Sequence, residues 1–154
     1  MTAKKTKATV QVEKEHELIK TNLHEINETI GKDLAGKDFS EWKLDFMWKL
    51  RDFRNTLEKH FDFEEESGFI QEIVDRAPET LNHAKELKKE HGEIVQVLDT
   101  IITELKSMDY LQEEKLLQIR EQVATFVASI REHENAENEL VQKVYCQEYG
   151  YPSA

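Results

Sequence analysis

Residues 119–144 read IREQVATFVASIREHENAENELVQKV, and their apolar side chains recur at every third or fourth position. This spacing keeps side chains on one buried face of a packed helix. Two side chains on that face are polar, namely His133 and Glu137. The stretch therefore predicts a long helix that carries an imidazole and a carboxylate into the core. The complete stripe is Ile119, Val123, Phe126, Ile130, His133, Glu137, Leu140 and Val144.

Three further stripes with the same spacing run through residues 12–30, 46–64 and 84–105. Their polar members are His16 in the first, His60 and Glu64 in the second, and His91 in the third. No Lys or Arg lies in any of the four stripes. Buried ionised carboxylates are strongly unfavourable unless a partner compensates them. We therefore expect a metal cation to be the partner of these six side chains.

The composition favours an all-α fold. Of the 154 residues, 34% are charged and 38% hydrophobic, with only five Gly and two Pro, which is typical of a helical protein rather than of a sheet protein. We predict an all-α, antiparallel up-down four-helix bundle that forms one domain over residues 1–154. The bundle itself is expected from about residue 10 to residue 146, with short polar tails at both ends.

Capping residues and helix breakers predict where the helices begin and end. The first helix is expected from about Ala8 to Leu34, with its end near Gly31 to Gly36. The second is expected to be capped by Ser40 and to run through Glu66, with a further turn or two after Ser67-Gly68 to Arg76. The third is expected from Pro78 to Ser107, and the fourth should follow an Asp109/Gln112 capping box and reach Cys146. Residues 147–154 are expected to form the C-terminal tail.

An internal repeat relates the two halves of the chain. Lys14-Glu15-His16 matches Lys89-Glu90-His91, 75 positions later. Glu58-Lys59-His60-x-x-x-Glu64 matches Arg131-Glu132-His133-x-x-x-Glu137, 73 positions later. Two nearly equal offsets predict duplicated helical hairpins that meet around a pseudo-twofold axis.

Two histidines lie off the stripes and serve as controls. His24-x-x-x-Glu28 has the same spacing as the motifs on the stripes, but residues four apart on any helix are neighbours and often form a solvated pair. His83 stands beside Ala84, which is on the third stripe. We interpret both histidines as surface residues.

The ligand types select among metals. Four imidazoles and two carboxylates are too many for one tetrahedral zinc ion and too rich in nitrogen for calcium or magnesium. Two ions, each held by two histidines and sharing both glutamates, would use all six, with an oxygen bridge from solvent and an open position. Such mixed sets suit iron, with manganese or zinc as alternatives. Ferritin-like di-iron proteins instead use Glu-x-x-His motifs on two helices; this chain has one, at Glu13-x-x-His16, and Glu13 lies off the stripe.

With this set of residues, the chain resembles the hemerythrin-like family of HHE cation-binding four-helix bundles, from about Val10 to Val144. The motif His60-Phe61-x-x-Glu64-Glu65 strengthens the resemblance. The matching residues are His16, His60, Glu64, His91, His133 and Glu137. The family implies a non-haem di-iron centre that binds or reacts with dioxygen, nitric oxide or related small oxidants. Oxygen-carrying members are similar but have an additional histidine, and an aspartate five residues after the fourth-helix histidine, where this chain has Asn138. The symmetric His/Glu set is closer to members linked to iron–sulfur cluster repair, nitrosative stress, or iron and oxygen sensing.

We therefore expect a binding or sensing protein whose partner is a small gaseous ligand, dioxygen or nitric oxide. A di-iron oxidase, peroxidase or nitric-oxide-handling enzyme is the alternative, with Glu15 or Glu90 as a source of protons. Ligand binding is favoured because the neighbours of the ligands on the stripes offer no general acid or base: Ile19, Leu57, Ile94 and Ile130. A third interpretation is a metal-free bundle that binds a protein partner. Three aromatic residues beside the second stripe would then form a dimer face, unless they pack inside the monomer: Phe61, Phe63 and Phe69.

Charge and cysteine content narrow the expected partners and location. The net charge of −11 repels phosphate backbones and anionic membrane surfaces, so neither nucleic acid nor a membrane is expected as a partner. Cys146 is the only cysteine, which excludes an internal disulfide and a thiolate zinc site and fits a reducing, cytoplasmic location. No apolar run approaches the roughly 18 residues of a membrane span, and residues 1–14 contain no apolar signal-peptide core.

Overall fold

A computed structural model of the chain describes residues 4–34 and 38–148, with side chains described up to residue 145. This part of the chain is helical and contains no strand, so the predicted all-α class is confirmed. The elements are α1 (Lys7–Gly31), α2 (Phe39–Glu66), α3 (Phe69–Arg76), the 3-10 helix η1 (Pro78–Thr80), α4 (Leu81–Ser107) and α5 (Glu113–Glu148).

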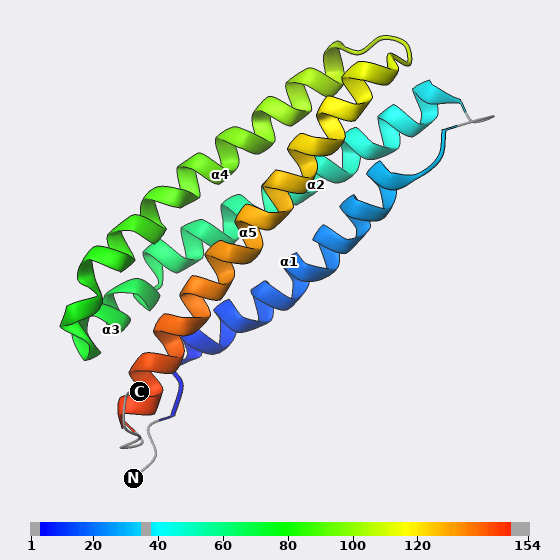
Figure 1. The fold of residues 1–154 in the computed structure, drawn as a ribbon. Helices are drawn as coiled ribbons and strands as arrows, with labels where there is room; N and C mark the ends of the chain where they lie inside the picture. Colours follow the sequence, from blue (N-terminus) through cyan, green and yellow to red (C-terminus); the bar gives the residue numbers. More distant parts are fainter. Residues whose placement is uncertain (1–3, 35–37, 149–154) are drawn as a thin grey trace.

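The long helices of the described residues are α1, α2, α4 and α5, and Figure 1 shows that they lie side by side and define the shape of the molecule. Consecutive long helices run in opposite directions, and the short α3 lies at the end of the molecule where α1 begins and α5 ends. Helix α1 packs against α2 and α5, and α4 packs against the same two helices. Each long helix therefore has two long neighbours and presents one face to the interior.

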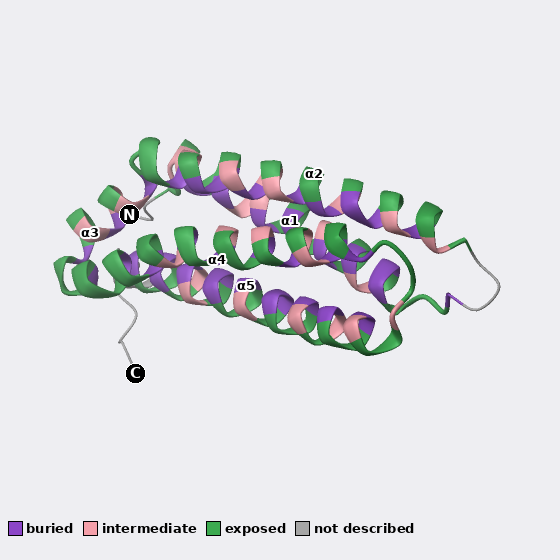
Figure 2. Ribbon diagram, turned by 90° about the horizontal axis from the view of Figure 1, so that it is seen from above, coloured by how far each residue is buried: buried purple, intermediate pink, exposed green. Residues whose placement is uncertain are grey.

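The faces that point inward are the four predicted stripes. Every apolar residue of the stripes is buried, and Figure 2 shows the buried residues as bands along the inner sides of the helices. The apolar interior is divided into a larger cluster that contains Ile19, Leu57 and Ile94, and a smaller cluster that contains Val12 and Leu140. The polar members of the stripes lie between these two clusters.

Several predicted helix boundaries differ from those in the structure. The first long helix ends at Gly31, at the start of the range predicted for its end. Helix α2 is capped by Asp38, whose carboxylate accepts the backbone N–H of Ser40, so the prediction of Ser40 as the cap is wrong. Both residue types are good N-caps. Asp38 comes earlier in the chain and accepts the Ser40 N–H, which has no partner within the helix, so the helix begins at Phe39.

The later helices also begin further along the chain than predicted. Pro78 opens the 3-10 turn η1, and the α-helical part starts at Leu81. The capping box at Asp109 is wrong, because α5 begins at Glu113 and the carbonyl of Gln112 accepts the N–H of Leu116. At the other end, α5 runs to Glu148, beyond the predicted end at residue 146. The remainder of the predicted tail, residues 149–154, lies outside the described residues.

The aromatic side chains beside the second stripe pack inside the monomer. Phe61 and Phe69 are buried, and the half-buried Phe63 packs against the smaller core cluster. Within the described residues, no helix combines the length and the apolar character needed to cross a bilayer.

Candidate metal centre

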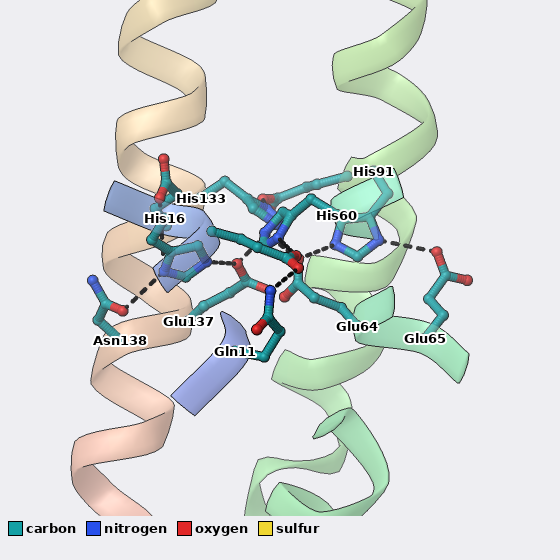
Figure 3. Close-up of polar contacts among 12 residues, drawn as sticks. Gln11, His16, His60, Glu64, Glu65, His91, His133, Glu137 and Asn138 are labelled. Carbon is teal, nitrogen blue, oxygen red and sulfur yellow. Dashed lines mark hydrogen bonds and ion pairs between the residues drawn. The ribbon is translucent and has the colours of Figure 1, made fainter. Parts of the chain in front are cut away.

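The six polar side chains of the stripes come together at one level of the molecule (Figure 3). Helix α1 contributes His16, α2 contributes His60 and Glu64, α4 contributes His91, and α5 contributes His133 and Glu137. None of the six is more than 4% exposed to solvent. The heptad spacing explains their position, because each replaces an apolar residue on a face that is buried along its whole length.

The two carboxylates lie between pairs of histidines. Glu64 Oε1 is 2.8 Å from His60 Nε2 and 3.7 Å from His91 Nε2. Glu137 Oε1 is 3.2 Å from His16 Nε2 and 3.5 Å from His133 Nε2. Every histidine therefore turns its Nε2 atom toward a glutamate at the centre of the cluster.

The cluster divides into two overlapping groups that could each hold a metal ion. One group is His16, His60, Glu64 and Glu137, and the other is Glu64, His91, His133 and Glu137. Within each group the candidate ligand atoms lie within 4.8 Å of one another. The two glutamates belong to both groups, which is the sharing expected from the sequence. The assignment of these residues as ligands stays a prediction.

Several buried nitrogen and oxygen atoms of the cluster lack hydrogen-bond partners, and these atoms could instead coordinate a cation. Among the described residues, the Nε2 atoms of His60, His91 and His133 are buried and have no partner in hydrogen-bonding geometry, and the same holds for both carboxylate oxygens of Glu64 and for Oε2 of Glu137. The 2.8 Å approach of His60 Nε2 to Glu64 is therefore a close contact and not a hydrogen bond. Buried polar atoms are nearly always hydrogen-bonded, and leaving them without a partner is costly. Imidazole nitrogens and carboxylate oxygens are also good ligands for iron, manganese and zinc. The donor set therefore fits a pair of such ions.

The outer nitrogen of each histidine is held by a neighbouring polar side chain. His60 Nδ1 lies 2.7 Å from a Glu15 oxygen, and His133 Nδ1 lies 2.8 Å from a Glu90 oxygen. His91 Nδ1 lies 3.1 Å from Glu65 Oε2 (Figure 3). A carboxylate accepts a hydrogen bond, so Nδ1 donates its proton and the Nε2 lone pair faces the centre. His16 differs, since its Nδ1 donates to Asn138 Oδ1 over 3.3 Å.

Burial changes the proton affinities of the carboxylates. It raises the pKa of Glu64 from 4.5 to about 7, assisted by the charge of Glu134. It also raises the pKa of Glu137 to about 7, assisted by the adjacent Glu64 carboxyl group. Without a cation, these groups therefore take up protons near neutral pH. A cation would compete directly with those protons.

The histidines respond to burial in two ways. Burial lowers the pKa of His60 and of His91 below the usual value, which keeps both imidazoles neutral. Burial would also lower the pKa of His16, but the hydrogen bond and charge of Glu137, together with Glu134, raise it above the usual value. In the metal-free protein, His16 therefore carries a proton more readily than His60 or His91 does.

Glu134 is a buried residue of the site that lies outside the predicted stripes. It is only 4% exposed, its Oε2 atom has no hydrogen-bond partner in the described part of the chain, and this atom lies 3.6 Å from His16 Nδ1. Burial raises its pKa to about 7. Glu134 follows His133 directly and so lies off the heptad positions. Its counterpart in the internal repeat is Phe61, 73 positions earlier, and comparing the repeats would have drawn attention to it.

The two control histidines lie on the surface, as predicted. His24 and Glu28 form an exposed pair at 3.0 Å, with side chains 72% and 65% accessible. His83 is exposed on α4. The same His-x-x-x-Glu spacing therefore gives a buried pair on a stripe and an exposed pair off it.

Two clefts reach the edge of the cluster from outside. One, of about 400 Å³, lies between α1 and α5 and is lined by His16, Asn138 and Tyr145, among others. The other, of about 340 Å³, lies between α4 and α5 and is lined by Glu90 and His133, among others. Small molecules can therefore approach a histidine of either group.

Comparison with known proteins identifies a family. A family model described as the hemerythrin HHE cation binding domain matches residues 7–145, a range that includes all six polar residues of the stripes. No curated protein and no solved structure gave a match.

Proposed function

The chain belongs to the hemerythrin HHE cation-binding domain family, and on this premise we propose that it is a non-haem di-iron protein that binds, senses or handles dioxygen or nitric oxide. The observation that carries the proposal is the pair of buried His/Glu groups that share Glu64 and Glu137. Manganese or zinc would use the same donor atoms. We also propose that residues 1–154 form one domain of this family.

The proposed ligands are the six side chains of the stripes. His16 and His60 would hold one ion, His91 and His133 the other, and Glu64 with Glu137 would bridge them. The ring centroids of His16 and His60 are 5.0 Å apart with an interplanar angle of 66°, and the same two values describe His91 and His133. This correspondence supports a four-helix bundle of two hairpins related by the pseudo-twofold repeat.

Iron bound there would supply ferrous and ferric states and a coordination position for a small neutral ligand. The chain surrounds that position with apolar residues, since the neighbours of the ligands along the stripes are buried: Ile19, Leu57, Ile94 and Ile130. Dioxygen and nitric oxide lose little solvation on entering such surroundings, whereas polar and charged substrates lose much more. The surroundings therefore favour a small, uncharged ligand.

A second candidate function is a di-iron oxidase, peroxidase or nitric-oxide-handling enzyme. The observation that favours it is Glu134, which is buried, has a pKa near neutrality and lies 3.6 Å from His16. Such a group can donate or accept a proton during a reaction. Glu15 and Glu90 could do the same from the outer side of His60 and His133.

Exposure of the reduced protein to each gas distinguishes the two functions. Iron-loaded, anaerobically reduced protein is mixed with dioxygen or nitric oxide, and the visible spectrum is followed. A binder or sensor gives a new band that forms with about one gas molecule per centre and then remains stable. An enzyme continues to consume the gas when a reductant is supplied. A spectrum that neither gas changes, in protein that contains iron, would refute both.

A further inference from the structure

The outer side of α2 carries two large apolar side chains that remain open to solvent. Leu44 and Trp48 keep 70% and 68% of their surface accessible. They are four positions apart, and residues at this spacing are neighbours on one face of a helix. Figure 2 shows exposed residues along the side of α2 that faces away from the other long helices. Covering these two side chains would therefore remove a continuous apolar patch from water.

This pair differs from the other exposed apolar residues on the long helices. Single apolar side chains scattered over a surface are normal, whereas an apolar patch marks an interaction site. Tryptophan is also enriched at the centres of protein interfaces. In the described part of α1, α4 and α5, the exposed large apolar side chains stand singly, without a second one a turn away: Val10, Leu18, Leu81, Val97 and Leu117.

Charged side chains continue the same face at both ends of the pair. Glu41 lies three positions before Leu44, and Arg51 lies three positions after Trp48. The face therefore has the three-four-three spacing of a helix seam. Both charged residues are exposed, and neither forms an ion pair with another described residue. We call these four residues the α2 outer face.

The order of residues on the α2 outer face is complementary to itself. A twofold axis that passes between Leu44 and Trp48 places each Leu44 against the Trp48 of a second, antiparallel copy. The same axis places each Glu41 against the Arg51 of the other copy, so two opposite-charge pairs close the ends of the patch. A parallel pairing would instead bring like charges together. The charge pattern therefore selects an antiparallel, isologous contact.

We propose that the α2 outer face docks a second copy of this chain and forms an antiparallel twofold dimer. Each partner of a stable interface buries roughly 800 Å², and two apolar side chains cover much less. The dimer therefore forms at high protein concentration and dissociates on dilution. Arg51 lies nine positions before His60, about 13 Å along the helix. The contact is thus separate from the metal centre, and the inference does not depend on the proposed function.

Sedimentation equilibrium of the full-length protein over a wide concentration range measures the association. The buffer contains about 0.15 M salt, which screens the repulsion between two copies of net charge −11. The wild-type mass should rise from monomer toward dimer with concentration. Trp48→Ala should abolish the rise, because buried tryptophans supply much of the energy of an interface. In Trp42→Phe, whose only tryptophan is Trp48, fluorescence should shift to shorter wavelength over the same concentrations.

Reversing the charges tests the antiparallel pairing itself. Glu41→Arg and Arg51→Glu each bring like charges together at both ends of the patch, and each should weaken association about 10-fold. An equimolar mixture of these two variants restores opposite charges at both ends and should associate as the wild type does. Arg131→Glu reverses an exposed charge on α5 and is the matched control. It should leave association unchanged.

Three results would overturn the inference. The first is wild-type protein that stays monomeric at every concentration, which would leave the α2 outer face to a different protein. The second is a dimer that persists in Trp48→Ala, since the contact would then lie elsewhere. The third is a mixture of Glu41→Arg and Arg51→Glu that associates no better than either variant alone. All these variants keep the six side chains of the metal centre, so their iron content should equal that of the wild type.

Discussion

Replacing Glu64 with Gln should stabilise the metal-free protein at pH 8, although it removes a proposed ligand. Glu64 is fully buried, and burial raises its pKa from 4.5 to about 7. A carboxyl group with a raised pKa in the folded state lowers stability as the pH rises from 4.5 to 7, and the loss is complete above 7. At about 1.4 kcal/mol for each tenfold change in proton affinity, the cost at pH 8 is about 3 kcal/mol. Gln carries no such charge.

Urea unfolding in the presence of a chelator measures this effect. At pH 8 the metal-free Glu64→Gln variant should exceed the wild type by up to about 3 kcal/mol, and at pH 4.5 the difference should largely vanish. With metal bound, the order should reverse at pH 8, because the variant has lost a ligand. Glu66→Gln, an exposed change on the same helix, serves as the control. A metal-free variant that is less stable than the wild type by the same amount at both pH values would refute the reasoning.

Three further predictions concern the other residues of the site. His24→Ala and His83→Ala should keep the full metal content in elemental analysis, whereas His60→Ala should lose metal; loss in either surface variant would show that the stripes were assigned wrongly. The rise in melting temperature on adding metal should be larger at pH 8 than at pH 6, because carboxyl groups with a pKa of about 7 must release protons before they bind; calorimetry showing a rise independent of pH would contradict this. Phe61→Ala should lower the unfolding free energy by about 3–5 kcal/mol in urea titrations. Phe63 is only half-buried, so Phe63→Ala should lower the unfolding free energy by a smaller amount; equal losses would contradict the packing described.

The helices and the central six residues were predictable because burial along a helix follows a local rule. A residue three or four positions from a buried residue lies on the same face, so His16 and His91 could be assigned to the interior without knowing how the helices pack. The same rule separated them correctly from His24 and His83. Their convergence was expected because their types form one ligand set, whereas their alignment along the helix axes follows from the structure.

The errors have identifiable physical origins. Asp38 and Ser40 are both competent caps, and the local sequence does not decide between them. Glu134 was missed because the stripe rule counts only the positions that face the axis, whereas a helix packed between two neighbours buries a wider face. The contacts of Glu65 and Asn138 depend on which neighbouring helix lies against each histidine, so they required the packed arrangement.

The iron content of purified protein tests the central claim most directly. Protein expressed with ample iron should contain about two iron ions per chain, because six ligands on four helices cannot all reach one ion. The matched double variant Glu64→Gln/Glu137→Gln, which removes both shared carboxylates, should lose most of this iron while remaining folded. A wild-type value that stays near one, or iron-free protein whose melting curve is unchanged by added metal, would contradict the account.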